Sequence, residues 1–532
     1  MRQNGVGGSR QDALAGAARA WPWLAFGILQ IGAISVFWLF DALPFMDLPA
    51  HAGILALKHR FDPAGFEGKF FIVFQHLGPY SLFSGLGEVF TAWFGANAAV
   101  RLLATLPTLA LPMAVLWARL RLTGQVTAFF GFAGIILSFG FITLSGFASF
   151  MLSLAIMLVT LTEWLILIGL VDSRRGRLPN LIVVTLLAFI TFNAHGYTFI
   201  LLLFVAGISV LSMARFWAGM LHTVAFAPAT IAAAYSLYVE RLLNPATEIA
   251  QHSPHPVFQG AFDKISLLIT PTLMTRTGVD ALIGVLLWLV IVSYALVTYR
   301  AASRPDAQLS AERKLYVCSL LYAAAALFLA FLALPHSVGW FGFVDGRLLP
   351  LVLLLGLIAI DEDVLRGAWE RAIRLGAGIS AAVIVGLVLA ASYGFQAEAT
   401  GYRDIVAKVP ASVRLLNLPL DPNSVIFTSH PFVHYDKLVL VERPIVPSDI
   451  WFHQGSGIYP TPANPALHLP AEYSSSNLKG IVWEHYRLND WDYVLIRTKP
   501  EVAAPRVPAT LTLVEHIGGW WLYRNVSALR QH

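Results

Sequence analysis

Long apolar stretches fill the first three quarters of this chain and limit what it can fold into. A helix that crosses a membrane needs roughly 20 mainly apolar residues, and eleven stretches approach that length. The 532 residues are 57% hydrophobic and 13% charged, which is too apolar for a water-soluble globule. We therefore predict an all-α polytopic membrane domain with about eleven transmembrane helices, near residues 21–40, 98–118, 125–142, 145–168, 179–194, 196–213, 221–239, 279–298, 315–334, 346–360 and 375–395.

Arginines between these stretches predict how the chain crosses the membrane, because cytoplasmic loops carry an excess of arginine and lysine. With eleven spans, every arginine cluster falls on one side if Pro79 to Phe94 is an interfacial helix and not a span. Residues 1–20 then form a cytoplasmic N-terminal segment before an uncleaved anchor. Residues 21–397 form the transmembrane domain, with residues 41–97 as a large outer loop.

The last part of the chain, residues 398–532, is mixed in polarity and rich in proline, which indicates a separate water-facing domain. Its pattern predicts a small α/β domain with a helix over Arg403 to Leu418, strands at Ser424 to Ser429 and Tyr493 to Thr498, and a hairpin over Leu511 to Asn525. By the same topology this domain is periplasmic, and the protein belongs to the inner (cytoplasmic) membrane of a bacterium.

Composition also excludes several function classes. The net charge of +5 comes mostly from arginines beside the membrane, so it implies membrane lipid and no nucleic acid. The only cysteine lies in an apolar stretch, so no disulfide framework is expected. The predicted spans hold almost no ionisable side chain away from their ends, whereas a transporter usually places several in its helices. The polar chemistry is therefore expected at the outer face.

One outer segment, Met46 to Pro63, is unusually rich in ionisable side chains. If Asp47 begins a helix, the 3.6-residue period places Asp47, His51, Lys58 and Asp62 on one stripe beside an apolar one. Such a helix should lie along the membrane surface. Two interpretations stay open: an amphipathic anchor whose first turn Asp47 caps, or part of a site.

The next residues resemble a pattern of the GT-C membrane glycosyltransferases, which include protein O-mannosyltransferases and lipid A aminoarabinose transferases. In that family an acidic residue after the first span begins a surface helix, a proline-aromatic segment forms a further outer helix, and an FG…A.RL element opens the second span. The corresponding residues here are Asp47, then Pro79 and Tyr80, then Phe94, Gly95, Ala99, Arg101 and Leu102. Gly346 to Pro350, GRLLP, is similar to a later element of the family.

The resemblance implies a reaction and roles for these residues. A sugar would pass from a polyprenyl-phosphate donor to a glycan, lipid or protein acceptor of the cell envelope, at the outer face of the membrane. Asp47 would deprotonate the acceptor, with His51 one turn on orienting it or sharing the proton. Arg347 and Lys58 would hold the carrier phosphate.

Further residues complete the predicted site. Arg101 or His336 could support the phosphate from farther out, while His195, Tyr80 and Asp345 would line the pocket or meet the acceptor. Arg347 could instead simply pair with Asp345 at the interface. A divalent metal on Asp47, His51 and His195 is a variant of this scheme, because carboxylate and imidazole are common ligands. No other cofactor is expected.

A non-catalytic function remains as the alternative. The segment Phe141 to Gly146, FITLSG, contains no acid where many members of the family have one. The same fold could then serve a protein that binds lipid-linked sugar or assists assembly in envelope biosynthesis.

Overall fold

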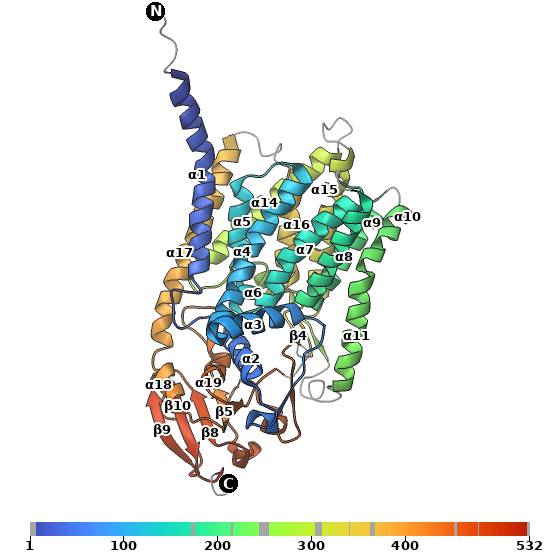
Figure 1. Cartoon of the computed structure of the whole chain (residues 1–532). Helices are drawn as coiled ribbons and strands as arrows, with labels where there is room; N and C mark the ends of the chain where they lie inside the picture. Colours follow the sequence, from blue (N-terminus) through green and yellow to red (C-terminus); the bar gives the residue numbers. More distant parts are fainter. Residues whose placement is uncertain are drawn as a thin grey trace, which may run out of the picture.

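The computed structural model describes residues 7–171, 176–213, 216–243, 255–303, 311–339, 341–361, 368–451, 455–476 and 478–528. A bundle of long helices carries a smaller domain with a β-sheet at one end, and the N-terminal end of α1 projects from the other (Figure 1). Part of the predicted N-terminal segment, residues 1–6, and the arginine pair at 174 and 175 lie outside the described residues.

Each of the eleven predicted apolar stretches coincides with a helix. Seven helical stretches among the described residues are long and apolar enough to cross a membrane, and four shorter apolar helices account for the other predictions. Length and composition thus identify a multi-pass membrane protein. The helices are α1 (Gly7–Ser35), α4 (Ala96–Thr123), α5 (Ala128–Ser138), α7 (Ala148–Leu167), α8 (Arg177–Ala194), α9 (Gly196–Leu211), α11 (Ala227–Leu243), α14 (Val279–Ser303), α15 (Ala311–Ala333), α16 (Leu348–Ala359) and α17 (Ala368–Glu398).

The core of the bundle lies around α7, which packs against α4, α8 and α9. Its sequence is apolar on every side, as expected of a helix surrounded by other helices. The buried Trp164 indole N–H donates to the Ser209 hydroxyl at 2.9 Å, and the buried Glu163 carboxylate pairs with Arg121 at 3.1 Å. Short helices connect the bundle, namely α6 (Phe141–Leu144), α10 (Phe216–His222) and α13 (Ala261–Leu267).

Arginines mark the end of the bundle that is farthest from the β-sheet domain. The Arg119 guanidinium is fully buried and donates to the carbonyls of Ile358 and Ile360 where α16 ends. Arg313 pairs with Asp361 at 3.1 Å in the same region. A cation is favourable at the C-terminus of a helix because the last carbonyls lack partners there. The polar outer-loop residues lie at the other end, as the sequence predicts; which end faces the cytoplasm stays a prediction.

Two helices of the predicted outer loop cover that other end: α2 (Leu48–Arg60) and α3 (Ser81–Phe94). The stripe pattern indicates a helix with one exposed polar face, and that expectation is wrong for α2; its position along the membrane surface stays a prediction. Residues from Leu48 through Ala50 and Ala52 through Leu57 are buried, because α2 packs against α3 and α4 on one side and against α19 (Lys437–Glu442) of the C-terminal domain on the other (Figure 1). A helix covered on both sides needs apolar residues all round.

The C-terminal domain contains a five-stranded sheet with strand order β6-β5-β8-β10-β9. Strands β5 and β6 are parallel, as are β5 and β8, while β10 runs antiparallel to both β8 and β9. The predicted hairpin is confirmed as β9 and β10, and the predicted strand from Tyr493 as β8. The elements are α18 (Tyr402–Ala407), β5 (Val413–Pro419), β6 (Ile445–Pro447), β8 (Tyr493–Arg497), β9 (Leu511–Ile517) and β10 (Trp520–Asn525).

Two predictions in this domain are wrong. The helix expected over Arg403 to Leu418 ends at Ala407, and the sequence after Pro410 forms strand β5. Proline ends a helix, and the apolar run after it is buried inside the sheet. Ser424 to Ser429 is no strand: only Phe427 forms an isolated bridge, with Thr275 of the membrane domain. That segment contacts the bundle, where Phe427 is fully buried, while Val425 is 80% exposed.

Short strands tie the outer loops together. Strand β1 (Phe71–Val73) of the first outer loop pairs with β7 (Ile458–Pro460) of the C-terminal domain. Strands β2 (Pro256–Val257), β3 (Ser337–Val338) and β4 (Phe341–Gly342) form a small sheet directly before α16. The first sheet fixes the C-terminal domain over α2, and the second fixes the chain that leads into Arg347.

Candidate active site

Asp47 lies at the junction of the bundle, α2 and the C-terminal domain. It precedes the first residue of α2, yet its carboxylate makes no capping hydrogen bond, so the interpretation of Asp47 as a helix cap is not supported. Only 7% of the residue is exposed. The Asp47 N–H donates to the Ser145 carbonyl at 3.3 Å and the Met46 N–H to the Leu144 carbonyl at 3.0 Å. The Asp47 carboxylate is thus buried and is not used to cap α2.

The Phe141 to Gly146 segment brings the bundle up to Asp47, and Gly146 makes this approach possible. Gly146 has a φ of +84°, and a Cβ on it would lie 2.6 Å from the Asp47 nitrogen. Any other residue would therefore be strained and would also displace Asp47. Phe141 to Gly146 contains no acid, but it packs directly against the backbone of Asp47.

Arg347 precedes α16 and is held among aromatic rings. Its guanidinium carbon lies 4.3 Å from the ring centroids of both Phe147 and Phe341, and 5% of the residue is exposed. Arginine stacks on aromatic faces while its N–H groups stay free to bind at the edge of the plane. Its Nε has no hydrogen-bond partner among the described residues. A buried arginine with donors to spare is suited to an anion.

Asp345, the alternative partner of Arg347, is engaged elsewhere. Its carboxylate is fully buried and accepts from Lys264 Nζ at 2.5 Å and from the Gly346 N–H at 2.7 Å, while His336 Nδ1 lies 2.9 Å away. Lys264 also donates to the carbonyls of Phe331 and Leu334. No motif in the sequence singles out Lys264. Asp345, His336 and Lys264 therefore fix the chain before α16, and a contact of Asp345 or His336 with a ligand stays a prediction.

His195 and Tyr80 complete the surroundings of Arg347. His195 Nε2 lies 3.4 Å from Arg347 Nη1, and its ring meets the Tyr80 ring edge-on at 4.8 Å. His195 is 2% exposed and its Nδ1 has no hydrogen-bond partner among the described residues. Tyr80 has a φ of +70°, which is strained for a residue with a side chain. Strain of this kind persists where the surroundings require one orientation, here toward His195 and Arg347.

Asp47 interacts electrostatically with Arg347 and therefore belongs to the same site as Arg347, His195 and Tyr80. Burial raises the pKa of Asp47 from 3.8 to about 8, the positive charge of Arg347 lowers it in part, and the Asp449 carboxylate raises it. Asp47 and Arg347, 300 residues apart in sequence, thus share one buried site together with His195 and Tyr80. A neutral pH leaves Asp47 largely protonated, because its pKa is above 7.

Two other predicted residues, His51 and Lys58, lie on α2 and make contacts of their own. The His51 ring packs against the rings of Phe83 and Trp451, each at 5.0 Å. Lys58 binds Glu88 and donates to Gln75 Oε1 and Ser84 Oγ, both at 2.7 Å. It lies three helical turns beyond Asp47 on α2, about 16 Å along the axis. His51 is therefore near the site, and Lys58 is held away from it by its own partners.

Arg101 belongs to a different part of the molecule. Its guanidinium donates to the carbonyls of Phe37, Phe40 and Asp41 after the end of α1. It also lines a cavity of about 930 Å³ between the bundle and the C-terminal domain. The α2 residues that line the cavity are Leu48, Pro49 and Ala52. The cavity therefore lies on the opposite side of α2 from Asp47 and His51. Arg101 supports the helix end and does not face Arg347.

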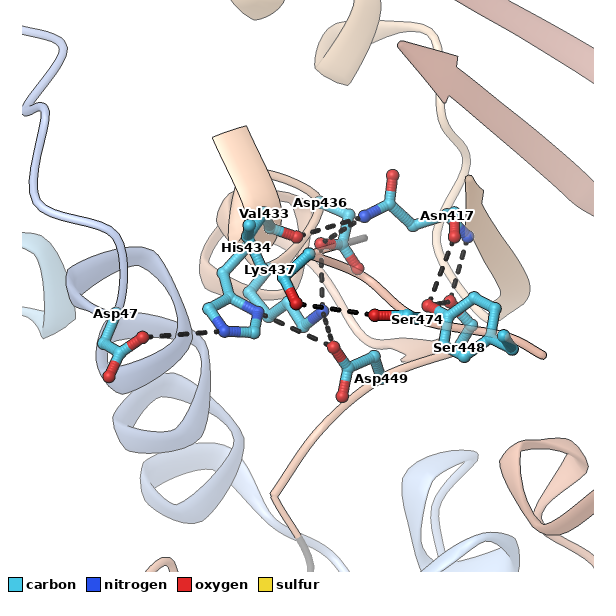
Figure 2. A network of polar contacts seen from close by, with 11 residues as sticks. Asp47, Asn417, Val433, His434, Asp436, Lys437, Ser448, Asp449 and Ser474 are labelled. Atoms are coloured by element: carbon cyan, nitrogen blue, oxygen red, sulfur yellow. Dashed lines mark hydrogen bonds and ion pairs between the residues drawn. The ribbon is translucent and has the colours of Figure 1, made fainter. Parts of the chain in front are cut away.

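The C-terminal domain contributes a group that the sequence analysis did not single out. Figure 2 shows His434, at the end of η4 (Pro431–His434), between two carboxylates. His434 Nε2 lies 3.7 Å from Asp47 Oδ1, and His434 Nδ1 lies 3.8 Å from Asp449 Oδ2. Lys437 Nζ is 3.8 Å from the same Asp449 oxygen and 3.0 Å from Asp436 Oδ1. No spacing motif marks these residues, because the fold alone brings them to Asp47.

The metal variant has no geometric support among the residues that the structure describes. No group of three or more His, Cys, Asp or Glu side chains gathers there in a way that could hold a metal ion. Asp47, His51 and His195 therefore do not form the predicted ligand set. His195 is directed to Arg347 and Tyr80, and His51 lies between Phe83 and Trp451.

Comparison with known proteins places the fold. No protein-family model matches the chain, and no curated protein is similar to it in sequence. The crystal structure of ArnT from Cupriavidus metallidurans in the apo state matches with a TM-score of 0.59 at 12% identity, over 96% of this chain and 99% of that one. ArnT bound to undecaprenyl phosphate matches with 0.56 at 13% identity, over the same shares.

A second protein shows the same likeness. The cryo-EM structure of the arabinofuranosyltransferase AftD from Mycobacteria matches with a TM-score of 0.51 at 15% identity, over 95% of this chain and 40% of that one. ArnT, a lipid A aminoarabinose transferase, and AftD are both GT-C glycosyltransferases. The resemblance seen in the sequence is therefore confirmed at the level of the fold: this chain has the architecture of the GT-C membrane glycosyltransferases.

Proposed function

We propose that the protein is a membrane glycosyltransferase that moves a sugar from a polyprenyl-phosphate carrier to an acceptor of the cell envelope. The observation that carries this proposal is the shared buried site of Asp47 and Arg347. Burial and the charge of Arg347 both act on the Asp47 carboxylate. An ionisable carboxylate beside an arginine with spare donors is what such a transfer needs, because a base must act next to a departing phosphate.

Arg347 is the proposed phosphate-binding residue. The guanidinium is stacked between Phe147 and Phe341, which fixes the plane of its N–H groups. A planar fork of donors binds two phosphate oxygens at once and stabilises the negative charge that grows as the sugar–phosphate bond breaks. The apolar bundle beneath it suits a carrier with a long isoprenoid tail. ArnT, which has the same fold, has been solved with undecaprenyl phosphate bound.

Asp47 is the proposed base. It would take the proton from the acceptor hydroxyl while that oxygen bonds to the sugar and the phosphate departs. Only the ionised carboxylate can do this, and the pKa of about 8 places its ionisation above neutrality. The transfer rate should therefore rise with pH through about 8 and level off above it, if Asp47 titrates as the free acid.

The test incubates the purified full chain in lipid nanodiscs with a panel of polyprenyl-phosphate sugars and with envelope glycans, lipids and peptides as acceptors. Wild type should release polyprenyl phosphate, and Asp47→Asn should reduce turnover by about 100-fold or more, as loss of a general base does. The control is Asp62→Asn, which changes an exposed aspartate just after the same helix. Equal turnover by wild type and Asp47→Asn would remove Asp47 from the mechanism.

A non-catalytic protein that binds lipid-linked sugar is the second candidate. The high pKa of Asp47 favours it, because a protonated carboxylic acid donates a hydrogen bond to a bound sugar or phosphate and needs no further step. In that case every donor in the panel would bind without turnover. Asp47→Asn would also retain binding, because an amide can donate in the same place.

A further inference from the structure

His434 and Asp449 of the C-terminal domain are placed as a path from Asp47 to the solvent. The two ring nitrogens of His434 face two carboxylates, with Nε2 at 3.7 Å from Asp47 Oδ1 and Nδ1 at 3.8 Å from Asp449 Oδ2. Figure 2 shows the imidazole lying between them. A small movement of the ring, or one bridging water on each side, shortens such separations to hydrogen bonds.

We infer that His434 and Asp449 relay protons for Asp47, so that His434 accepts the proton that Asp47 has taken from the acceptor and Asp449 passes it to the outer solvent. The inference rests on the proposed function. His434 and Asp449 are positioning residues, since they act through Asp47 and do not touch the reacting atoms.

The chemistry requires such an exit at every turnover. The acceptor O–H bond breaks and its proton moves to Asp47, the acceptor oxygen bonds to the sugar carbon, and the phosphate oxygen leaves with the electron pair of the old bond. Asp47 is then a carboxylic acid, and it must lose the proton before it can act again. Transfer of the proton to His434 Nε2, with loss of the Nδ1 proton toward Asp449, returns Asp47 to its carboxylate and leaves His434 neutral with its proton on Nε2. A flip of the imidazole ring then restores the starting tautomer.

The solvent exposure of the three side chains increases from Asp47 and His434 to Asp449, which gives the relay a direction. The Asp47 side chain is 10% exposed and that of His434 7%, whereas that of Asp449 is 23% exposed. A proton on Asp449 therefore reaches water, while a proton on Asp47 has no such direct route. The Trp451 ring stands edge-on to the imidazole at 5.5 Å and covers it. Covered groups exchange protons with water through a neighbour rather than directly.

The charges around the ring support a neutral His434 and an ionised Asp449. Burial, together with the positive charge of Lys437, lowers the pKa of His434 to about 3. Lys437 faces Asp449 and favours its carboxylate form. A neutral imidazole with its Nδ1–H toward Asp449 presents the Nε2 lone pair to Asp47. Because the low pKa of His434 disfavours an imidazolium, this tautomer accepts the proton of Asp47 only as its Nδ1 proton leaves toward Asp449.

All the charged or titratable groups that face the pair enter the pH dependence. His434 faces Asp47, His51, Lys437 and Asp449. Asp449 also interacts with Asp436 and Tyr473, and Asp47 with Arg347. The carboxylate of Asp449 raises the pKa of Asp47, so Asp449→Asn should lower that pKa and move the rising limb of the rate profile to lower pH. The same change breaks the exit, so the rate at the plateau should also fall.

The kinetic test compares the full chain in nanodiscs with three variants. His434→Ala should lower kcat by about 100-fold without changing KM for the donor, and added imidazole should restore part of the rate. In Asp449→Asn the rising part of the rate–pH profile should move to lower pH, and the maximal rate should be lower than in wild type. His485→Ala, at an exposed histidine of the same domain that pairs with Glu472, is the control and should match wild type. A His434→Ala variant with the wild-type kcat at every pH would overturn the relay.

A second readout does not depend on turnover. The infrared band of the protonated Asp47 carboxyl, identified as the band that Asp47→Asn removes, should move to higher frequency in His434→Ala because the acid loses its acceptor. In Asp449→Asn it should titrate at lower pH than in wild type. An unchanged band in both variants overturns the relay even if no donor is turned over. If the band shifts are present but Asp47→Asn turns over as fast as wild type, the proposed function is overturned and the Asp47–His434–Asp449 contact is still established.

Discussion

At the scale of single residues, Arg347 differs from the other arginines of the bundle in what its donors do. Arg119 and Arg101 donate to backbone carbonyls at helix ends, whereas Arg347 lies 3.4 Å from the His195 imidazole and stacks on the rings of Phe147 and Phe341. Its spare donors, and not its charge alone, make it suited to the phosphate. A substitution that keeps the charge and removes the planar fork therefore separates the two contributions.

Arg347→Lys should raise KM for the polyprenyl-phosphate donor by about 10-fold or more, because a lysine offers one point charge in place of two aligned N–H groups. Steady-state kinetics with varied donor measures this. The matched control is Arg497→Lys, at a buried arginine of β8 that also stacks on aromatic rings, Phe432 and Trp520. A similar rise in KM in both variants would mean that loss of stacking, and not of phosphate contacts, is responsible.

Sequence reasoning found part of this site. Asp47 and Arg347 follow from the resemblance, and His195 from its position at a turn between two apolar stretches. His434 and Asp449 could not be found, because they belong to a domain without a recognisable motif and meet Asp47 only through folding. Lys58 and His336 carry suitable side chains, but their neighbours Glu88 and Asp345 engage them, and pairing of that kind is visible only in three dimensions.

At the scale of elements, the long apolar helices were predictable and the short elements were not. Twenty apolar residues specify a membrane helix almost regardless of context. The run Val413 to Leu418 has no such length, so periodicity alone assigned it to a helix while burial in the sheet makes it β5. The burial of α2 was missed for a related reason, since the covering helix α19 comes from a distant part of the chain.

Gly146 offers a test of how closely the bundle must seat Asp47. Gly146→Ala adds a Cβ 2.6 Å from the Asp47 nitrogen, which should displace the start of α2 and reduce turnover by about 100-fold, as misplacement of a catalytic group by about 1 Å can. Gly124→Ala is the control, because Gly124 has a similar φ of +70° but no atom within 4 Å of the added Cβ.

Both alanine variants carry backbone strain of about 1–2 kcal/mol at a positive φ, so their melting temperatures should fall together. Only Gly146→Ala should lose turnover. If Gly124→Ala loses as much turnover, backbone strain and not displacement of Asp47 is the cause, and the contact of Gly146 with Asp47 has no special role.

At the scale of the whole molecule, the C-terminal domain closes over α2 and brings its own charged residues to the end of the bundle. Two places there could receive a carrier lipid: the buried site of Asp47 and Arg347, and the 930 Å³ cavity that Arg101 lines on the other side of α2. The apolar bundle lies beneath both. The account places the carrier phosphate at the first.

The most direct measurement is a structure of the inactive Asp47→Asn chain in nanodiscs with a polyprenyl-phosphate sugar. We predict density for the phosphate in contact with the Arg347 guanidinium, with the sugar next to residue 47 and the isoprenoid tail between helices of the bundle. Phosphate density against Arg101 in the 930 Å³ cavity, with the Arg347 site unchanged, would contradict the account.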